Sequence, residues 1–438
     1  MLHTSREDNT VAGIRTSVDE GIASESLYSY AYYPFLLLWV FALVPKELCI
    51  LSYGLLAVVM CYLASKRKHF RVLPASFTLI VGFLAFAISI YCFAIAAAVV
   101  REYNFNRLLA ALNTLAIWVV AAIYFIFYLK LDCKPKLITM SRYCFANSIV
   151  LIALLILYAV DPSLSFSNGL EHRHLSIADY LDAGQSVRFV GFLDYSTLVV
   201  MMLFIIYPLA IYYCASRYSL PVALSYGVVS FLPAIATSSR AAVLFGCVLV
   251  AISLIFVLLE KSITARRYRV AITVLITLLL IIVAIAHGSE LADTAISILN
   301  KRSDSTAGRM YLYDESIRLV FDESPVFGLG IKYTSLLTND APLGSHSTWV
   351  GFLYKTGILG FLLYLSVFVL VIIKLAKVST LTKPVKRYFV LCAILFMAYL
   401  AIEDLDGVAW ACITWFSIVA VLISPAELRS SCASARLE

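Results

Sequence analysis

Three arginines lie near the ends of hydrophobic runs, where their side chains could bind an anion at a membrane surface. Arg188 shortly precedes one run, Arg240 opens another after Thr237-Ser238-Ser239, and Arg309 begins an amphipathic stretch. A guanidinium group is planar, keeps its charge and donates paired hydrogen bonds, so it suits phosphate and pyrophosphate. Each arginine alone could instead reach lipid phosphates or form a structural ion pair. Together they indicate a pyrophosphate-binding site.

One histidine is placed where it could act as a base. His346 lies in Gly344-Ser345-His346-Ser347-Thr348, at the end of the polar stretch 287–347. An imidazole titrates near neutral pH and can accept the proton of a hydroxyl group. A histidine before a helix can also serve as a cap or a packing residue. His172 and His174 are weaker candidates in a solvated polar run, and His287 is predicted to be structural.

Acidic residues and cysteines give little sign of a metal or cofactor site. Asp404-Leu405-Asp406, with Glu403 beside it, formally matches the Asp-x-Asp pair of metal-dependent sugar transferases. A charged turn explains these residues equally well, so no metal ligand and no cofactor are predicted. The ten cysteines show no metal-binding spacing, and neither a disulfide nor structural zinc is expected.

The elements that must position these residues are membrane helices. Of the 438 residues, 62% are hydrophobic and 14% are charged, and the mean hydropathy is +0.91. A soluble protein would carry about 25% charged residues. Apolar runs that continue for about 16 to 25 residues are typical of spanning helices, whereas barrel strands alternate over about ten. We therefore expect an all-α polytopic membrane protein.

About twelve membrane spans are expected from these runs. Their predicted bounds are 30–44, 48–64, 77–100, 108–128, 143–160, 195–214, 220–236, 241–259, 270–286, 357–373, 388–402 and 408–423. Pro221 and Pro233 predict a kink or break in the seventh span. Most of these spans carry no charge at their centres, and Lys355, near the edge of a span, is the main exception.

Charge orients the helices. Lysine and arginine cluster in the even-numbered connections, as in Lys66-Arg67-Lys68, and this bias predicts that both chain ends are cytoplasmic. Residues 1–29 and 425–438 are then cytoplasmic tails, and 30–424 form a single membrane domain. The two long polar connections, 161–194 and 287–347, are expected on the outer face. The net charge of +7 largely reflects this bias, so no nucleic-acid partner is predicted.

An ordered set of short motifs resembles the bacterial O-antigen polymerase and O-antigen ligase superfamily. The motifs are Arg188-Phe-Val-Gly191, Thr237-Ser-Ser-Arg240, Gly308-Arg309 followed by Pro325-Val-Phe-Gly328-Leu-Gly330, and His346 followed by Gly357-Ile-Leu-Gly360. Each motif is loose, but their order across residues 180–375 is more specific. Many members have asparagine after the histidine, where this chain has Ser347.

This resemblance implies an inverting, metal-independent glycosyltransferase of the C-type membrane fold. The donor would be an undecaprenyl-pyrophosphate-linked oligosaccharide, held by Arg188, Arg240 and Arg309. His346 would take the proton of the acceptor hydroxyl, and the helix over residues 309–321 would cover the site. The resemblance further implies the bacterial inner membrane, with the site facing the periplasm. Membrane lipids and a chain-length regulator would be additional partners.

Two activities of this superfamily share the same donor chemistry. A polymerase joins glycan repeat units on their lipid carrier, whereas a ligase transfers the glycan to lipid A–core. The long tyrosine-bearing outer connection and the His-Ser pair favour the polymerase. A polysaccharide or solute transporter is a further alternative, although most predicted spans carry no charge at their centres. Sugar identity, linkage and oligomeric state are not predicted.

Overall fold

A computed structural model describes the helical parts of the chain. The described residues are 34–35, 38–44, 46–66, 73, 75–100, 104–130, 137–160, 189–193, 196–237, 239–261, 303–334, 342–379 and 381–424. Both predicted tails and the predicted span 270–286 lie outside these ranges. So do Arg188, His172, His174 and His287.

Within the described ranges the regular secondary structure is helical, with one isolated antiparallel bridge between Thr334 and Pro342. The helices are α2 (Leu38–Leu43), α3 (Lys46–Lys66), α4 (Ala75–Val99), α5 (Phe105–Lys130), α6 (Leu137–Val160), α8 (Ser196–Arg217), α9 (Leu220–Val229), α10 (Leu232–Ala236), α11 (Arg240–Lys261), α13 (Ser303–Glu323), α14 (Thr348–Lys377), α15 (Lys383–Tyr399), the short 3₁₀-helix η5 (Leu405–Gly407) and α16 (Ala409–Ile423).

Five of the described helices are long and apolar enough to cross a membrane. Their spanning segments are Phe77–Val100, Phe105–Lys130, Leu137–Val160, Ser196–Arg217 and Thr348–Lys377. Shorter apolar helices cover Leu48–Tyr62, Leu220–Ala236, Leu244–Glu260 and Ala409–Ile423. These helices are those of a polytopic membrane protein, as the sequence predicts.

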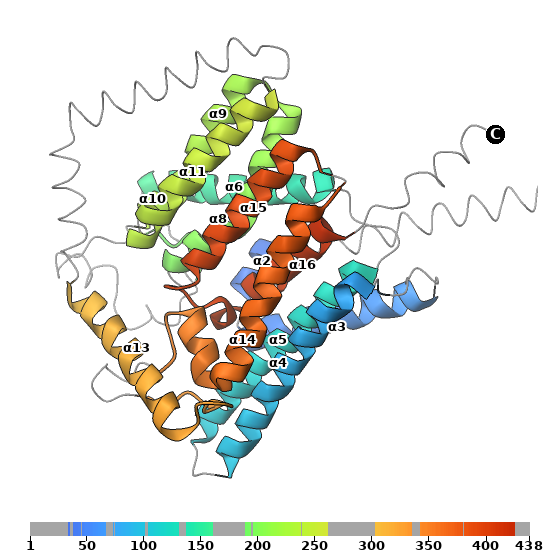
Figure 1. Ribbon diagram of the computed structural model, residues 1–438. Helices are drawn as coiled ribbons and strands as arrows, with labels where there is room; N and C mark the ends of the chain where they lie inside the picture. The colour runs from blue at the N-terminus through green and yellow to red at the C-terminus, as the bar shows by residue number, and fades with distance from the viewer. Residues whose placement is uncertain are drawn as a thin grey trace, which may run out of the picture.

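The helices pack around two that are buried along almost their whole length, α8 and α16. In Figure 1, α4 runs beside α14, and α11 runs beside α15. The helix α6 packs against α8, and α5 packs against α16. A helix that is apolar on all sides has to be enclosed by others or by lipid, and α8 and α16 are enclosed by protein.

The predicted break in the seventh span is confirmed. The span divides into α9 and α10, with Ser230 and Phe231 between them. Pro221 and Pro233 each lie in the first turn of one helix. Proline lacks an N–H group and is tolerated there, because the first N–H groups of a helix have no partner inside it.

The helix α14 begins earlier than the predicted span at residue 357. It begins at Thr348 and is interrupted at Gly357, whose backbone has a φ of 63° and a ψ of −170°. The segment after α13 fills this interruption, because Leu329 N–H donates to Tyr354 O at 2.8 Å and Ile358 N–H donates to Pro325 O at 2.8 Å. The first turns of α14 are thereby separated from the membrane span proper and tied to α13.

Candidate functional site

His346 is held in an unusual backbone conformation directly before α14. Its φ is 62°, which lies in the left-handed region that few residues other than glycine adopt. In the described ranges, His346 is the only residue other than glycine with a positive φ. This conformation costs of order 1–3 kcal/mol and persists where surrounding contacts impose it. The cap of α14 is the next residue, Ser347, whose hydroxyl accepts from Val350 N–H at 3.3 Å. His346 is therefore not the cap.

The Ser347 cap accounts for one departure from the family pattern. Serine and asparagine are both among the preferred N-cap residues, because each side-chain oxygen can accept from the first turn of the helix. Ser347 is 1% exposed, and its cap fixes the backbone that follows the histidine. Serine can therefore give this position the same support as asparagine.

Two contacts from α13 hold the histidine loop. Ser316, buried on α13, accepts from Gly344 N–H at 2.7 Å, and Tyr313 O–H donates to the carbonyl of His346 at 2.6 Å. In Figure 1, α13 lies beside the first turns of α14. The helix predicted from Arg309 onward is confirmed, and it covers the loop that carries His346.

One side of α13 is buried and the other is exposed. Met310 and Phe321 are each 53% exposed, whereas Leu312 and Val320 are buried and pack with Leu329, Leu343 and Tyr354. The buried row follows Leu312, Ser316 and Val320 at intervals of four residues. A polar residue, Ser316, belongs to it because its hydroxyl is used by the histidine loop.

Arg309 projects from α13 toward the turn after α15. Its Nη1 donates to Ile402 O at 3.3 Å, and its Nη2 lies 4.0 Å from Glu403 Oε1. The Arg309 side chain is 33% exposed. The protein therefore covers this side chain only in part.

The segment from Glu403 to Asp406 carries three carboxylates, each beside a cation from another part of the chain. Asp404 Oδ2 lies 3.2 Å from Lys332 Nζ. Asp406 Oδ2 pairs closely with the buried Lys355 Nζ and also accepts from Trp118 Nε1 at 2.8 Å. With the Glu403–Arg309 pair, this segment joins α5, α13, α14 and the loop after α13.

The Asp404-Leu405-Asp406 pattern is a charged turn with one lysine for each aspartate. A shared metal would need both carboxylates aimed at one point, but here they bind different lysines. In the described part of the chain, histidine, cysteine and acidic side chains form no cluster of three that could hold a metal ion.

Burial lowers the pKa of His346 below its ordinary value of 6.5, and the positive charges of Arg309 and Lys332 lower it further. Asp404 acts in the opposite direction. The imidazole is therefore neutral at pH 7, which is the form that can accept a proton.

Burial has the opposite effect on a carboxyl group. It raises the pKa of Glu403 to about 7, while Arg309 and a hydrogen bond with Thr197 lower it and Asp404 raises it. A buried carboxyl group keeps a low pKa only where its surroundings strongly stabilise the charged carboxylate. Glu403 therefore changes charge near neutral pH.

Arg188 and the side chain of Arg240 lie outside the described structure, but residues near them in the chain are in contact. Phe189, which follows Arg188, donates its backbone N–H to Ala236 O at 3.3 Å. Arg240 is the first residue of α11, four positions after Ala236. Thr197, at the start of α8, faces Glu403, and Tyr399 O–H donates to Thr197 O at 3.3 Å. The contact with Glu403 places the start of α8 near the residues that surround His346.

Sequence reasoning did not select Lys332, it named Glu403 only beside the Asp-x-Asp pattern, and it placed Lys355 only near a span edge. No sequence pattern predicts the roles of these residues, because each acquires its role from a partner far away in the chain. The available signal was that Lys355 is a charged residue inside an apolar run, which is expensive unless the charge is paired.

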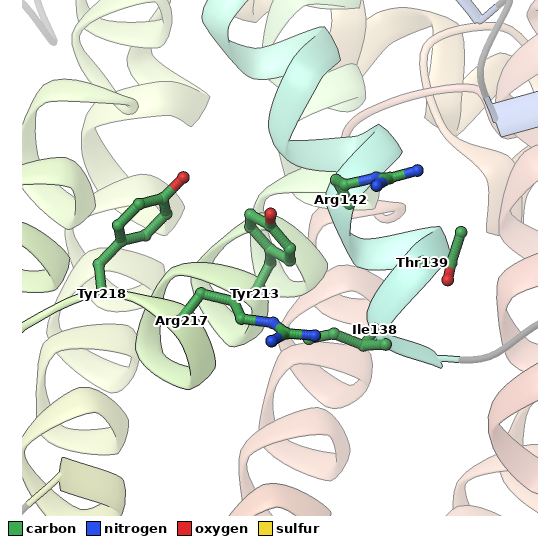
Figure 2. Close-up of a pocket in the computed structure, with 6 residues that line it drawn as sticks. All are labelled: Ile138, Thr139, Arg142, Tyr213, Arg217 and Tyr218. Atoms are coloured by element: carbon green, nitrogen blue, oxygen red, sulfur yellow. The ribbon is translucent and has the colours of Figure 1, made fainter.

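A separate pocket lies at the other end of α8. Its volume is about 280 Å³, and Ile138, Thr139, Arg142, Tyr213, Arg217 and Tyr218 line it. Figure 2 shows Arg142 on one helix and Arg217 on another, with the Tyr213 ring between them. From Thr197 to Arg217, α8 rises by about 30 Å at about 1.5 Å per residue. The pocket is therefore distinct from the site around His346.

The comparison with known proteins agrees with this geometry. Residues 225–365 match a family model described as O-antigen ligase. No curated protein matches the chain. The matched range includes Arg240, α13 and His346, and it supports the resemblance predicted from the sequence. Residues 225–365 are thus similar to the O-antigen ligase family.

Proposed function

We propose that this chain transfers a glycan from a polyprenyl-pyrophosphate carrier to an acceptor hydroxyl at the outer face of the bacterial inner membrane. The observation that carries the proposal is that a neutral His346, directly before α14, lies near the partly exposed Arg309 of α13. Such a transfer needs a base and a cation that keeps its charge. The family match supports the enzyme class.

In the proposed reaction, His346 accepts the proton of the acceptor hydroxyl as that oxygen attacks the anomeric carbon of the donor sugar. The bond between this carbon and the pyrophosphate oxygen breaks, and the carrier pyrophosphate leaves with the electron pair. Attack opposite the leaving group inverts the configuration of the anomeric carbon. Arg309, with Arg188 and Arg240, stabilises the charge that develops on the leaving group.

The first candidate for the acceptor is the next undecaprenyl-pyrophosphate-linked repeat unit, which makes the chain a polymerase. The second is lipid A–core, which makes it a ligase, and the match of residues 225–365 to the O-antigen ligase family supports this candidate. Both use the same donor site. The deletion strain separates them on a lipopolysaccharide gel: a core that carries one repeat unit identifies a polymerase, and bare core with accumulated lipid-linked polymer identifies a ligase.

The proposed site is tested by complementing the deletion strain with His346→Ala and Arg309→Ala. Removing a general base slows a reaction by about 10² to 10⁴-fold, and removing one charge-stabilising donor by about 10² to 10³-fold. We expect both variants to lose the glycan ladder while the protein stays in the membrane.

Arg318→Ala is the matched control for Arg309→Ala. Arg318 lies on the same helix and is 61% exposed, where it pairs with Glu315 and Asp322. This variant should restore the ladder. A normal ladder in both the His346 and the Arg309 variants would instead favour a transporter, because transport needs neither group.

A further inference from the structure

We propose that Glu403 is a positioning residue that holds Arg309 in the empty site and takes up a proton when the pyrophosphate of the donor draws Arg309 away. This inference rests on the proposed function, since it assigns a pyrophosphate-linked donor to Arg309. It makes donor binding and proton uptake a single coupled event.

The contact between Glu403 and Arg309 is a loose one. A guanidinium and a carboxylate in direct contact are commonly joined by hydrogen bonds of about 2.7–2.9 Å. Here Nη2 and Oε1 are 4.0 Å apart, and Oε1, although buried, accepts no hydrogen bond from the described residues. Charge attracts Arg309 to Glu403, but no hydrogen bond between the two side chains holds it there.

The backbone of Glu403 is held in place and cannot follow Arg309 toward a ligand. Its carbonyl accepts from Thr348 N–H at 3.0 Å and from Thr348 O–H at 2.6 Å. Leu405 N–H in turn donates to the Thr348 hydroxyl at 2.8 Å. Glu403 is therefore fixed to the first residue of α14, two positions after His346.

The charged and titratable groups around Glu403 leave it dependent on one cation. Arg309 and Tyr313 face it from α13, Thr197 faces it from α8, and Asp404 is its neighbour in the chain. Asp404 repels its negative charge, and Arg309 is the cation that stabilises it. By contrast, Asp404 and Asp406 have their own lysines.

Loss of Arg309 would leave a buried, unpaired carboxylate, which is a costly state that proteins avoid by protonation. In the empty site the pKa of Glu403 is about 7. With Arg309 on the donor, this pKa rises. Below pH 7 Glu403 is already neutral, so its charge does not oppose donor binding. Above pH 7 binding has to take up a proton, so affinity falls as pH rises.

The test measures donor affinity of the purified full chain in nanodiscs from about pH 6 to about pH 9. The probe is a synthetic polyprenyl-pyrophosphoryl-N-acetylglucosamine, whose pyrophosphate is a diester and gains no proton in this range. One linked proton gives a change in Kd of about tenfold per pH unit. We expect the Kd of the wild-type protein to be constant below pH 7 and to rise by that factor above it.

Glu403→Gln mimics the protonated side chain and should bind the probe at every pH as tightly as the wild-type protein does below pH 7. Glu315→Gln is the matched control, because Glu315 is also paired with an arginine, Arg318, on the helix α13 that carries Arg309. It should keep the wild-type pH dependence. A structural role for Glu403 would weaken binding at all pH values and would not remove the slope.

The outcomes separate this inference from the function on which it rests. If the wild-type protein does not bind the probe, or Arg309→Ala binds it equally well, the proposed donor site is wrong. If Arg309→Ala weakens binding but the wild-type Kd does not change with pH, the proton coupling is wrong. A slope retained in Glu403→Gln also overturns it. The measurement on the wild-type protein decides the question even where a variant fails to fold.

Discussion

His346 joins a left-handed backbone to a partly buried imidazole, and both features follow from its neighbours. Ser347 begins the helix after it, and Tyr313 binds its carbonyl. Histidine tolerates a positive φ better than most residues, but the conformation still has a cost. The contacts from α13 impose it. The same packing removes water from the imidazole and keeps it neutral.

The pH dependence of the reaction follows from this environment. Because burial lowers the pKa of His346 below 6.5, the neutral base is present at pH 7 and is lost as pH falls through that lowered pKa. We expect kcat, measured with saturating donor, to be level near pH 7 and to decline only below pH 6.5. Saturation removes the effect of Glu403 on donor binding.

Initial rates of the purified chain across this range check the expectation. The proton of Glu403 should alter KM above pH 7, whereas that of His346 should alter kcat below pH 6.5. A decline in kcat that begins well above pH 6.5 would contradict the neutral-base assignment.

The element that positions the site is the interrupted helix α14. Its break at Gly357 exposes backbone groups that an unbroken helix would satisfy internally. The segment from Pro325 to Gly330 supplies the partners, and Leu359 N–H also donates to Val326 O at 3.2 Å. The two glycine-containing motifs that the sequence analysis recognised separately are thus one structural unit. This unit fixes the end of α13 to the membrane span.

Gly357→Ala tests this unit. A Cβ at Gly357 would lie 2.3 Å from Val326 O and 2.5 Å from Gly328 N, and the φ of 63° is unfavourable for alanine. We expect a loss of at least about 2 kcal/mol in stability, because strain at such a position costs of order 1–3 kcal/mol before any clash. Thermal unfolding in detergent measures it.

Gly82→Ala is the matched control, since Gly82 also lies in a candidate membrane span and a Cβ there would meet no atom within 4 Å. Its unfolding temperature should be unchanged or slightly higher. Equal behaviour of the two variants would show that the break at Gly357 does not need glycine.

At the scale of the whole molecule, the charged site and the basic pocket occupy opposite ends of α8. Thr197 begins the helix beside Glu403, and Arg217 ends it beside Arg142. The predicted orientation puts the first end in the periplasm and the second in the cytoplasm. Such separation suits an enzyme whose lipid-linked donor presents its glycan on one face.

Cysteine labelling of spheroplasts with a membrane-impermeant maleimide tests this orientation. The ten native cysteines, which include the exposed Cys92 and Cys247, are first replaced by serine. Asp322→Cys, on the exposed side of α13, should then react in intact spheroplasts. Ser216→Cys, near the end of α8, should react only after lysis. The reverse pattern would place the site in the cytoplasm.

Local composition was sufficient to predict the class of protein and several of its features. Lipid requires backbone hydrogen bonds to be satisfied within each segment, so long apolar runs predict helices without knowledge of their neighbours. For the same reason Pro221 and Pro233 located the break between α9 and α10. The amphipathic pattern predicted the helix that contains Arg309, but the side that is buried was decided by what packs against the helix.

The sequence by itself determined the helical membrane character, the order of the helices, and the residue types able to bind pyrophosphate and accept a proton. Only the tertiary structure decided which cation accompanies each carboxylate. Lys332 and Asp404 are 72 residues apart, and Lys355 and Asp406 are 51 apart. Such pairs have no local spacing rule, because they depend on how distant helices pack. In a buried site, the packing of the helices therefore determines which partner each ionisable group has and whether that group is charged.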